Sequence, residues 1–349
     1  MNVEMIFYKL EFCQGSLFKI FSLREFPVFR GCNGFYIYLL QEYLLLCYQF
    51  FNGLQEKIIS METGFTYEEF TTRNIGFVSE EEQIILKNLR IFVPGVGGMG
   101  GTVVACLARV GIENFIIADL DSFEISNLNR QIFSSTLVIG KDKAAVTKRM
   151  LEIINPQIKV ELYGEMWVNE LDNILSKTDI VINGCDDIKS TIQLMRKCKE
   201  YKLPAIDAFA SPLPNVYVVH QNDKRPEEIF GFPTLNLPFD KITKEIEMLC
   251  LKKEVEHIGV HSSSLNYIDL QIAKEIMNGT RKRISFAPMV WTTACMMVYE
   301  VIRLSLHKKG GPGIKGMFFN PWTSTIEKPK GWLSSSIRRF FVRRYMRKV

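Results

Sequence analysis

Apolar and polar positions follow two different periodicities between residues 90 and 210. Short apolar runs, which predict strands, occur at Ile91–Val93, Phe115–Ala118, Lys159–Leu162, Ile180–Asn183 and Ala205–Ala208. The segments between them have helical periodicity and predict helices at Thr102–Val110, Lys141–Ile154, Val168–Ser176 and Ile188–Tyr201. Short apolar strands separated by helices predict an α/β fold with a doubly wound, mainly parallel sheet that has helices on both faces.

Glycine or aspartate lies at the carboxyl end of four of these predicted strands. The four residues are Gly95, Asp119, Asp186 and Asp207. In an open α/β sheet, ligands bind in the crevice beyond the carboxyl ends of the strands. The pattern therefore predicts a single ligand site to which all four positions are close.

Downstream, the pattern is less regular. It predicts a strand at Asn215–His220, an irregular stretch at Gln221–His261, and helices at Tyr267–Ile276 and Pro288–Leu306. Lys308–Gly316 is rich in glycine and lysine and is typical of a linker. We therefore expect one main domain at residues 61–308 and a separate tail at residues 309–349.

Residues 1–60 form an N-terminal extension of different composition. The extension is rich in aromatic residues, and Gln41 and Glu42 interrupt its apolar run at residues 34–51. A membrane-spanning helix needs about 20 such residues, and the basic start and small-residue cleavage site of a signal peptide are lacking. Three interpretations stay open: an accessory helix packed on the body, an interfacial anchor, and spurious upstream translation ahead of a start at Met61.

The net charge of +5 is concentrated at the C-terminus. Residues 331–349 include six positive side chains and no acid, and without these six charges the rest of the chain has a net charge of −1. Trp332, Phe340 and Phe341 stand among the arginines, which predicts a basic amphipathic helix. Such a helix can lie on an anionic membrane surface, bind nucleic acid such as tRNA, or remain a solvated tail, and these interpretations stay open.

Eight cysteines are scattered along the chain without a CxxC pair. This spacing indicates neither a disulfide framework nor a zinc ribbon, and it is typical of a cytoplasmic protein. Cys250 lies in a locally helical stretch without the marks of an activated thiol, although a nucleophilic role for it stays open. His257 and His261 are four residues apart, but Gly259 between them disfavours a continuous helix that would direct both at a metal.

A cluster of glycines follows the first predicted strand. Its members are Gly95, Gly97, Gly98 and Gly100. Glycine permits a sharp turn and lets backbone N–H groups approach a phosphate at the start of the next helix. Asp119, at the end of the following strand, is placed to accept ribose hydroxyls, as in Rossmann-like nucleotide sites. Asp121 either joins Asp119 in this role or caps the next turn.

Polar and positively charged residues after these acids indicate which nucleotide binds. Hydride transfer has no need of Arg130 and Lys143 beside the ribose, whereas an enzyme that breaks a nucleoside triphosphate must neutralise its charge. Lys143 also stands at a predicted helix start, where the helix dipole disfavours a purely structural lysine. We expect Asn127 and Gln131 to position the ligand, with turn formation as the alternative for Asn127. These residues favour ATP over a nicotinamide cofactor.

The combined pattern GxGGxG, DxD, NxNRQ and GxxK resembles the ThiF/MoeB/HesA family, whose fold is that of the ubiquitin-activating enzymes. The resemblance extends from about Phe65 to Leu306 and includes Pro156 and the strand and turn at residues 179–187. Many members of this family have two CxxC pairs for structural zinc, and this sequence has none.

The resemblance implies roles for further residues. Asp186 matches the catalytic aspartate that engages Mg²⁺ and the phosphates, and Asp187 stands where the family has asparagine, with helix capping as its other role. Arg73 resembles an arginine that reaches the ATP of a neighbouring subunit, which implies a homodimer with composite sites. The family often has arginine at the position that Thr191 occupies here.

The implied activity is ATP- and Mg²⁺-dependent adenylation of a carboxylate by an adenylyltransferase of the type that activates ubiquitin-like modifiers. The implied substrate is the C-terminus of a small ubiquitin-like or sulfur-carrier protein, or a peptide. Three alternatives stay open: a tRNA-modifying dehydratase of the same superfamily, a nicotinamide-dependent oxidoreductase, and a non-catalytic nucleotide-binding scaffold.

Overall fold

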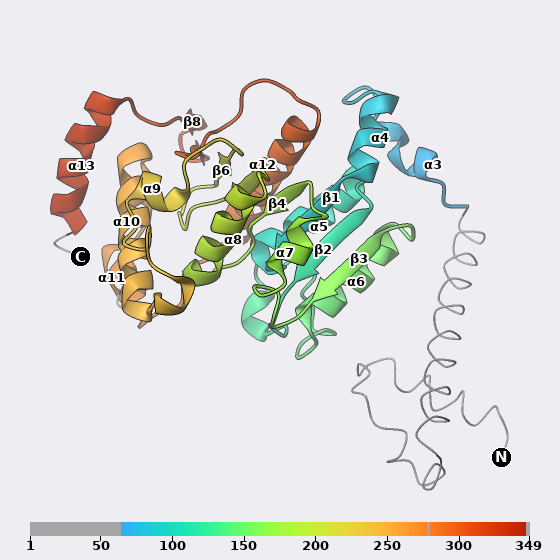
Figure 1. The fold of residues 1–349 in the computed structure, drawn as a ribbon, viewed down its shortest axis with the longest axis horizontal. Coiled ribbons are helices and arrows are strands. Elements are labelled where there is room, and N and C mark those ends of the chain that lie inside the picture. The colour runs from blue at the N-terminus through green and yellow to red at the C-terminus, as the bar shows by residue number, and fades with distance from the viewer. Residues whose placement is uncertain (1–63, 278–279, 347–349) are drawn as a thin grey trace, which may run out of the picture. The chain divides into compact units, whose positions relative to one another are not determined.

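A sheet of eight strands runs through the residues that the computed structural model describes, 64–277 and 280–346 (Figure 1). The strands are β1 (Arg90–Pro94), β2 (Asn114–Ala118), β3 (Lys159–Tyr163), β4 (Ile180–Ile182), β5 (Ala205–Asp207), β6 (Asn215–Val219), β7 (Met317–Asn320) and β8 (Thr325–Glu327). Residues 1–60, for which the sequence leaves three interpretations open, lie outside the described residues.

The strands follow the order β3-β2-β1-β4-β5-β6-β7-β8. The first five are parallel, with Phe92 of β1 beside Ile116 of β2 and Val181 of β4, and β6, β7 and β8 run antiparallel. The chain builds outward from β1 to β3 and then returns to the other side of β1 with β4. Such a reversal opens the crevice in which α/β sheets bind ligands. The predicted doubly wound, mainly parallel sheet is confirmed.

Helices cover both faces of the sheet. In the described part of the chain, the α-helices are α3 (Tyr67–Thr71), α4 (Glu80–Asn88), α5 (Gly98–Val110), α6 (Lys143–Ile154), α7 (Leu171–Leu175), α8 (Ile188–Glu200), α9 (Pro226–Phe230), α10 (Lys244–His261), α11 (Leu270–Met277), α12 (Ala287–Ser305) and α13 (Trp332–Met346). Helices α5, α6 and α12 pack on the face that presents Ile91 and Val93. Helices α7, α8, α9 and α10 pack on the face that presents Phe92. Because successive side chains of a strand point to opposite faces, burial on both sides produces unbroken apolar runs.

The prediction of an irregular stretch at Gln221–His261 is wrong for much of that stretch. The stretch contains α9 and α10, and α10 continues without a break through Gly259 to His261. A Cβ at Gly259 would lie 2.6 Å from Leu265 Cδ1 and 3.1 Å from Val342 Cγ1. Glycine stands here because other segments pack closely against the helix, and this packing offsets its low helix propensity.

The chain after Lys308 contributes two strands as well as a terminal helix. β7 pairs with β6 through Phe318 and Asn215, and β8 pairs with β7. Phe318 is fully buried, with its ring centroid 5.7 Å from that of Phe209. These two strands are not among those predicted from the sequence, whereas the helix expected in the tail is α13. Among the described residues, no helix is both long and apolar enough to cross a bilayer.

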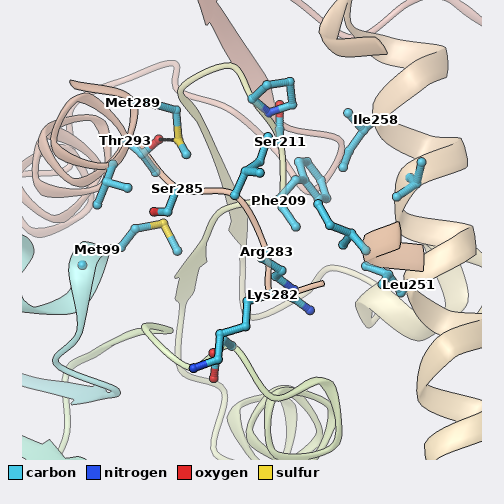
Figure 2. A pocket seen from close by; sticks show the side chains of 18 of the residues that line it. Met99, Phe209, Ser211, Leu251, Ile258, Lys282, Arg283, Ser285, Met289 and Thr293 are labelled. Carbon is cyan, nitrogen blue, oxygen red and sulfur yellow. Dashed lines mark hydrogen bonds between the residues drawn. The ribbon is translucent and has the colours of Figure 1, made fainter. Parts of the chain in front are cut away.

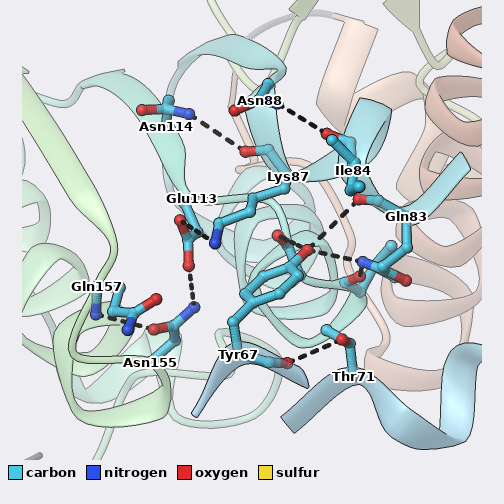
Figure 3. A network of polar contacts seen from close by, with 12 residues as sticks. Tyr67, Thr71, Gln83, Ile84, Lys87, Asn88, Glu113, Asn114, Asn155 and Gln157 are labelled. Carbon is cyan, nitrogen blue, oxygen red and sulfur yellow. Dashed lines mark hydrogen bonds and ion pairs between the residues drawn. The ribbon is translucent and has the colours of Figure 1, made fainter. Parts of the chain in front are cut away.

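A polar network attaches α3 and α4 to the amino-terminal edge of the parallel strands (Figure 3). The Tyr67 hydroxyl donates to Gly111 O at 2.8 Å and accepts from Gln83 Nε2 at 2.8 Å. Asn155 Nδ2 donates to Glu113 Oε1 at 3.2 Å. Gly111 and Glu113 lie just before β2, so the network holds both helices at the edge of the sheet that is remote from the carboxyl ends of its parallel strands.

Candidate active site

The loop after β1 contains glycines because two backbone segments touch there. Gly95 has φ of +80°, and a Cβ at this position would lie 2.5 Å from the carbonyl carbon of Gly184, in the loop after β4. A Cβ at Gly100 would overlap the carbonyl oxygen of Gly95. A larger residue fits neither position, so the two loops meet where the strand order reverses.

Helix α5 begins directly after this loop. Gly97 is its N-cap and Gly98 its first residue, and no side chain caps the helix. The first N–H groups of a helix have no partner within the helix, and the helix dipole adds partial positive charge at this end. This N-terminus is therefore suited to bind a phosphate group.

A cleft of about 1720 Å³ lies in front of the two loops (Figure 2). Its lining includes most of the predicted site residues, namely Gly95, Gly97, Gly98, Asp119, Asp121, Asn127, Arg130, Gln131, Lys143 and Asp186. Figure 2 shows that Met289 and Thr293 of α12 and Leu251 and Ile258 of α10 border the same space. Gly100 is not part of the lining, but it lies against the carbonyl oxygen of Gly95 in the glycine loop. The structure therefore brings together every predicted site residue apart from Arg73.

Asp119, just after β2, is held in place by the glycine loop. Its Oδ2 accepts from Val96 N at 2.8 Å, and its Oδ1 accepts from Asp121 N at 2.9 Å. Burial raises the pKa of this carboxyl, and the two backbone hydrogen bonds oppose the shift because they stabilise the charged form. Each carboxylate oxygen can accept a further hydrogen bond, so Asp119 can still receive the hydroxyl groups of a ligand.

Lys143 is the first residue of α6 and forms an ion pair with Asp121. Its Nζ lies 2.8 Å from Asp121 Oδ2, and the two side chains are 7% and 73% exposed, respectively. Asp142 caps α6 by accepting from Ala145 N at 2.6 Å. Neither interpretation of Asp121 offered from the sequence includes this ion pair, because the two residues are far apart in the chain.

Arg130 is anchored on the turn that follows the 3₁₀ helix η4 (Ile125–Asn127). Its Nη1 donates to Ser126 O at 2.7 Å and to Asn129 Oδ1 at 3.0 Å. Trp291 Nε1, from α12, donates to the backbone oxygen of Arg130 at 2.9 Å. The Nε and Nη2 groups of Arg130 form no hydrogen bond with a described residue, so they can reach a ligand in the cleft.

Two buried amide side chains beside this turn differ in their hydrogen bonds. Asn127 Oδ1 accepts from Glu124 N at 2.9 Å, which is the turn-forming role that the sequence left open. Gln131 is only 7% exposed, and within the described chain its Oε1 has no hydrogen-bond partner. A buried acceptor without a partner destabilises the folded state. Gln131 lines the cleft, but its Oε1 atom is not accessible to a ligand in this conformation.

Asp186 and Asp187 have different environments. Asp187 is the N-cap of α8, because its Oδ2 accepts from Ser190 N at 2.8 Å, and its Oδ1 lies 3.9 Å from Lys244 Nζ. Asp186 is exposed, lines the cleft and forms no hydrogen bond or ion pair with any described residue. The capping role of Asp187 is confirmed, and Asp186 is the carboxylate of the two that can meet a ligand.

A buried polar network lies close to these acids. Asn183 Nδ2 donates to Asp207 Oδ2 and to Thr191 Oγ1, each at 3.0 Å. The Tyr217 hydroxyl donates to Asp207 Oδ2 at 2.6 Å. Burial raises the pKa of Asp207 to about 7, although these donors favour its charged form. The sequence places Asp207 at a strand end, but its partners come from separate elements and cannot be found by spacing.

The cysteines closest to the site lack an activated thiol. Cys250 is fully buried in α10, and burial raises the pKa of its thiol to about 11. Cys185 lines the cleft, and burial, together with the charge of Asp119, raises the pKa of its thiol far above the ordinary value. The thiolate is the reactive form of cysteine. Both thiols therefore lack the lowered pKa that activates a cysteine.

Arg73 lies outside the cleft. It belongs to the 3₁₀ helix η3 (Thr72–Asn74), and the next residue, Asn74, donates from Nδ2 to Val110 O at 3.0 Å, at the last residue of α5. The glycine loop is at the other end of α5, whose 13 residues span about 20 Å. The exposed side chain of Arg73 is therefore remote from the cleft of its own chain.

The cleft also contains positive residues that the motifs do not identify. Arg281, Lys282 and Arg283 follow one another in its lining, and Figure 2 labels Lys282 and Arg283. Lys282 Nζ lies 3.9 Å from Glu124 Oε2, and Arg281 Nη1 lies 3.0 Å from Glu275 Oε2. The run of three cations is visible in the sequence, but such runs usually mark a solvated surface.

Curated proteins with similar sequences match part of this chain. The tRNA threonylcarbamoyladenosine dehydratase of Haemophilus influenzae is 33% identical over 35% of this chain and 47% of its own length. The molybdopterin-synthase adenylyltransferase of the same organism is 30% identical over 44% of this chain and 62% of its own length. The chain thus spans about half of the length of these relatives.

A solved structure and a family model extend the comparison. The microcin C7 biosynthetic enzyme MccB, in complex with N-formylated MccA, has a TM-score of 0.52 and is 20% identical, covering 71% of this chain and 66% of the MccB chain. At this identity the similarity concerns the fold alone. The model of the ThiF family matches residues 71–331, which contain all eight strands and every predicted site residue. The chain therefore belongs to the ThiF family.

Proposed function

We propose that this chain is an adenylyltransferase that uses ATP to activate a substrate carboxylate. One observation carries the proposal: the residues that a bound ATP requires line a single cleft. A glycine-capped helix N-terminus suits the phosphates, and Asp119 suits the ribose. Arg130 and Lys143 supply positive charge, and Asp186 supplies an unpaired carboxylate.

In the proposed reaction, an oxygen of the substrate carboxylate attacks the α-phosphorus of ATP. The bond from this phosphorus to the bridging oxygen breaks, pyrophosphate leaves with the electron pair, and an acyl-adenylate forms. Arg130 and Lys143 stabilise the negative charge that grows on the phosphates in the transition state. The resulting mixed anhydride makes the carboxyl carbon reactive toward a later sulfur or nitrogen nucleophile.

Mg²⁺ belongs to the same proposal, and the cleft residues fit it. This ion keeps several water ligands and is usually bound through one or two carboxylates together with substrate phosphates. Asp186 is exposed in the lining and unpaired within the described chain, so it can provide such a carboxylate. Bound there, Mg²⁺ would supply charge neutralisation at the phosphates.

A homodimer is a further part of the proposal. Arg73 is exposed and remote from the cleft of its own chain. It can therefore act on ATP only if a second copy of the chain places it at the cleft. A guanidinium is always charged and matches phosphate oxygens geometrically, which suits this role.

We place the substrate carboxylate at the end of a polypeptide. The part of the lining contributed by Phe209, Leu251, Ile258 and Met289 is apolar and can accommodate side chains of an extended tail. One relative is named for adenylyl transfer to molybdopterin synthase, which is itself a protein. The proposed substrate is a small ubiquitin-like or sulfur-carrier protein, or a peptide. Free cysteines and the need for ATP favour the cytoplasm as the site of the reaction.

A tRNA-modifying dehydratase is the second candidate. The relative with 33% identity has this name. Adenylation of a carboxylate on a modified nucleoside would use the same groups around ATP, so the two candidates differ in substrate alone. Arg281, Lys282 and Arg283 in the lining supply the positive charge that an RNA backbone requires.

ATP–pyrophosphate exchange tests the proposal. The full chain is incubated with ATP, Mg²⁺, labelled pyrophosphate and either a sulfur-carrier protein, a peptide or tRNA that bears threonylcarbamoyladenosine. We expect exchange that depends on one of these substrates and is lost in Asp186→Asn. The matched control, Asp187→Asn, should retain exchange because asparagine caps a helix as well as aspartate does. Undiminished exchange in Asp186→Asn would exclude its assigned role, and failure of the wild type to bind ATP would exclude the function.

A further inference from the structure

Helix α13 has an apolar side that no described residue covers. Leu333, Ile337, Phe340 and Phe341 are 65%, 54%, 65% and 62% exposed, respectively. Their spacing of four, three and one residues places them on one side of a helix, so they form a continuous stripe. Trp332, at the start of the helix, is 82% exposed. A contiguous exposed apolar surface marks a contact site, whereas scattered apolar side chains do not.

The opposite side of α13 attaches the helix to α10, which lies beside it in Figure 1. Val342 is buried and packs against Gly259. Arg338 Nη2 donates to Gly259 O at 3.1 Å, and Arg343 Nη2 lies 2.9 Å from Glu256 Oε1. Hydrogen bonds and an ion pair therefore fix the rotation of α13, and this rotation directs the apolar stripe away from the body. An ordinary surface helix has the reverse arrangement, with its apolar side buried.

Positive charge borders the stripe. Every charged residue from Lys328 to the C-terminus is lysine or arginine. A shallow hollow of about 400 Å³ is lined by Ser336, Arg339, Phe340, Arg343 and Arg344. Arg339 and Arg343 share Glu256, whereas Arg344 has no ion-pair partner within the described chain. Three guanidinium groups around one aromatic ring suit an anionic head group attached to an apolar body.

We propose that α13 docks this protein on an anionic phospholipid surface. The apolar stripe enters the boundary between head groups and acyl chains, and the arginines contact lipid phosphates. Interfacial helices combine Trp, Phe and Leu on one side with basic residues on the other, and bury the apolar side about 5–10 Å deep. Long arginine side chains can reach up to the phosphates from such a position.

Charge argues against a second copy of this chain as the occupant of the stripe. Two α13 helices that packed by their stripes would bring Arg344 of both copies into one interface, and neither helix has an acid to pair with it. Like charges repel more strongly once water is removed from between them. Lipid phosphates supply the negative charge that a second α13 lacks.

Docking also has a consequence for the cleft. Arg343 lines both the hollow on α13 and the cleft that contains Asp186, and Tyr345 and Met346 line the cleft as well. A protein docked through α13 would therefore present this side of its cleft close to the bilayer. The lipid proposal does not depend on the adenylation chemistry, since it rests on α13 alone.

Vesicle co-sedimentation of the full chain tests the proposal. Vesicles of phosphatidylcholine alone are compared with vesicles of equal parts phosphatidylcholine and phosphatidylglycerol. We expect binding to the anionic vesicles alone, and weaker binding when the ionic strength is raised from about 0.1 M to about 1 M, which shortens the Debye length to about 3 Å. Equal binding to both vesicles, or no binding to either, would overturn the proposal.

Two pairs of substitutions locate the contact. Phe340→Ser with Phe341→Ser, and separately Leu333→Gln with Ile337→Gln, should each lower vesicle binding by at least about tenfold, because each pair removes two large apolar side chains from the interface. Two pairs are used so that the result does not depend on the folding of one variant, and thermal unfolding checks both. The matched control is Phe77→Ser with Leu137→Ser, whose side chains are 91% and 81% exposed in turns outside α13.

The outcomes separate lipid from other occupants. Reduced binding in both stripe variants and unchanged binding in the control support docking through α13. Binding that persists in the stripe variants would place the contact elsewhere in the chain and overturn the proposal. Self-association of the wild type that the stripe variants abolish, without vesicle binding, would make the stripe an interface between copies, and this result also overturns it.

Discussion

Lys143 and Asp121 form an ion pair in the wall of the cleft, with Nζ 2.8 Å from Oδ2. The lysine side chain is 7% exposed and that of the aspartate is 73% exposed, so the packing of the lysine fixes the position of the pair. A triphosphate has more negative charge than one carboxylate and would compete for the same ammonium group. We interpret the pair as the nucleotide-free state of a phosphate-binding lysine.

Lys143→Met is expected to lower ATP–pyrophosphate exchange by about 100-fold, which is a typical loss for one preorganised electrostatic contact. Stability should change little, because Asp121 is 73% exposed and remains solvated without its partner, and methionine fills most of the space of the buried lysine side chain. Exchange kinetics and urea unfolding measure the two effects. Asp121→Asn retains the cation and should lose far less exchange. A loss as large as that of Lys143→Met would assign the ligand contact to the acid.

Gly100→Ala is expected to destabilise the glycine loop. The added Cβ would overlap Gly95 O and lie 3.3 Å from Val93 Cγ1, so the backbone must move. We expect the free energy of unfolding to fall by about 1–3 kcal/mol or more, and ATP binding to weaken with it. Gly97→Ala is the control, because its Cβ would have no neighbour closer than 3.5 Å. Equal urea midpoints for the two variants would contradict the close approach of the loops.

Stability is expected to fall below neutral pH because of two histidines of α10. Burial lowers the pKa of His257 to about 4 and that of His261 to about 3, and nearby Lys315, Arg338 and Arg339 also oppose protonation. The unfolded chain binds these protons near pH 6.5, so between that pH and about 4 it holds more protons than the folded chain. The free energy of unfolding should therefore fall with pH by up to ~1.4 kcal/mol per unit for each histidine.

A single substitution tests this assignment. His257→Gln removes one titrating group and keeps an N–H that can donate to Lys315 O, which lies 3.1 Å from His257 Nε2. Urea unfolding at several pH values should show a shallower pH dependence for this variant than for the wild type. Parallel profiles for His257→Gln and the wild type would exclude His257 as the source.

Arg73→Ala and Asp186→Asn are expected to fail in exchange separately and to recover when mixed. If each active site combines Arg73 of one copy with Asp186 of the other, subunit exchange creates a heterodimer in which one site has both residues. Light scattering gives the oligomeric state, and the exchange assay gives the recovery. Full activity of Arg73→Ala as a monomer would rule out the composite site.

The loop, the parallel strands and the carboxylates at their ends could be predicted because their signals are local. Gly95 and Gly97 follow an apolar run directly, and a run that is buried on both faces is unbroken in the sequence. The rule that ligands bind beyond the carboxyl ends of parallel strands then places Asp119 and Asp186 together.

The features that could not be predicted depend on contacts between distant segments. Helix α10 continues through Gly259 because Leu265 and Val342 approach it there. β7 is a strand because β6 offers it a free edge. The bond between Lys143 and Asp121 joins residues that the motif identifies separately, and nothing in their spacing indicates that they pair.

A crystal structure with a non-hydrolysable ATP analogue tests the central claim most directly. We expect Lys143 Nζ to leave Asp121, and both this group and the Arg130 guanidinium to lie within hydrogen-bonding distance of phosphate oxygens, with the ribose at Asp119. A bound nucleotide that leaves Lys143 paired with Asp121, and Arg130 directed away from the phosphates, would contradict the proposed role of the two cations.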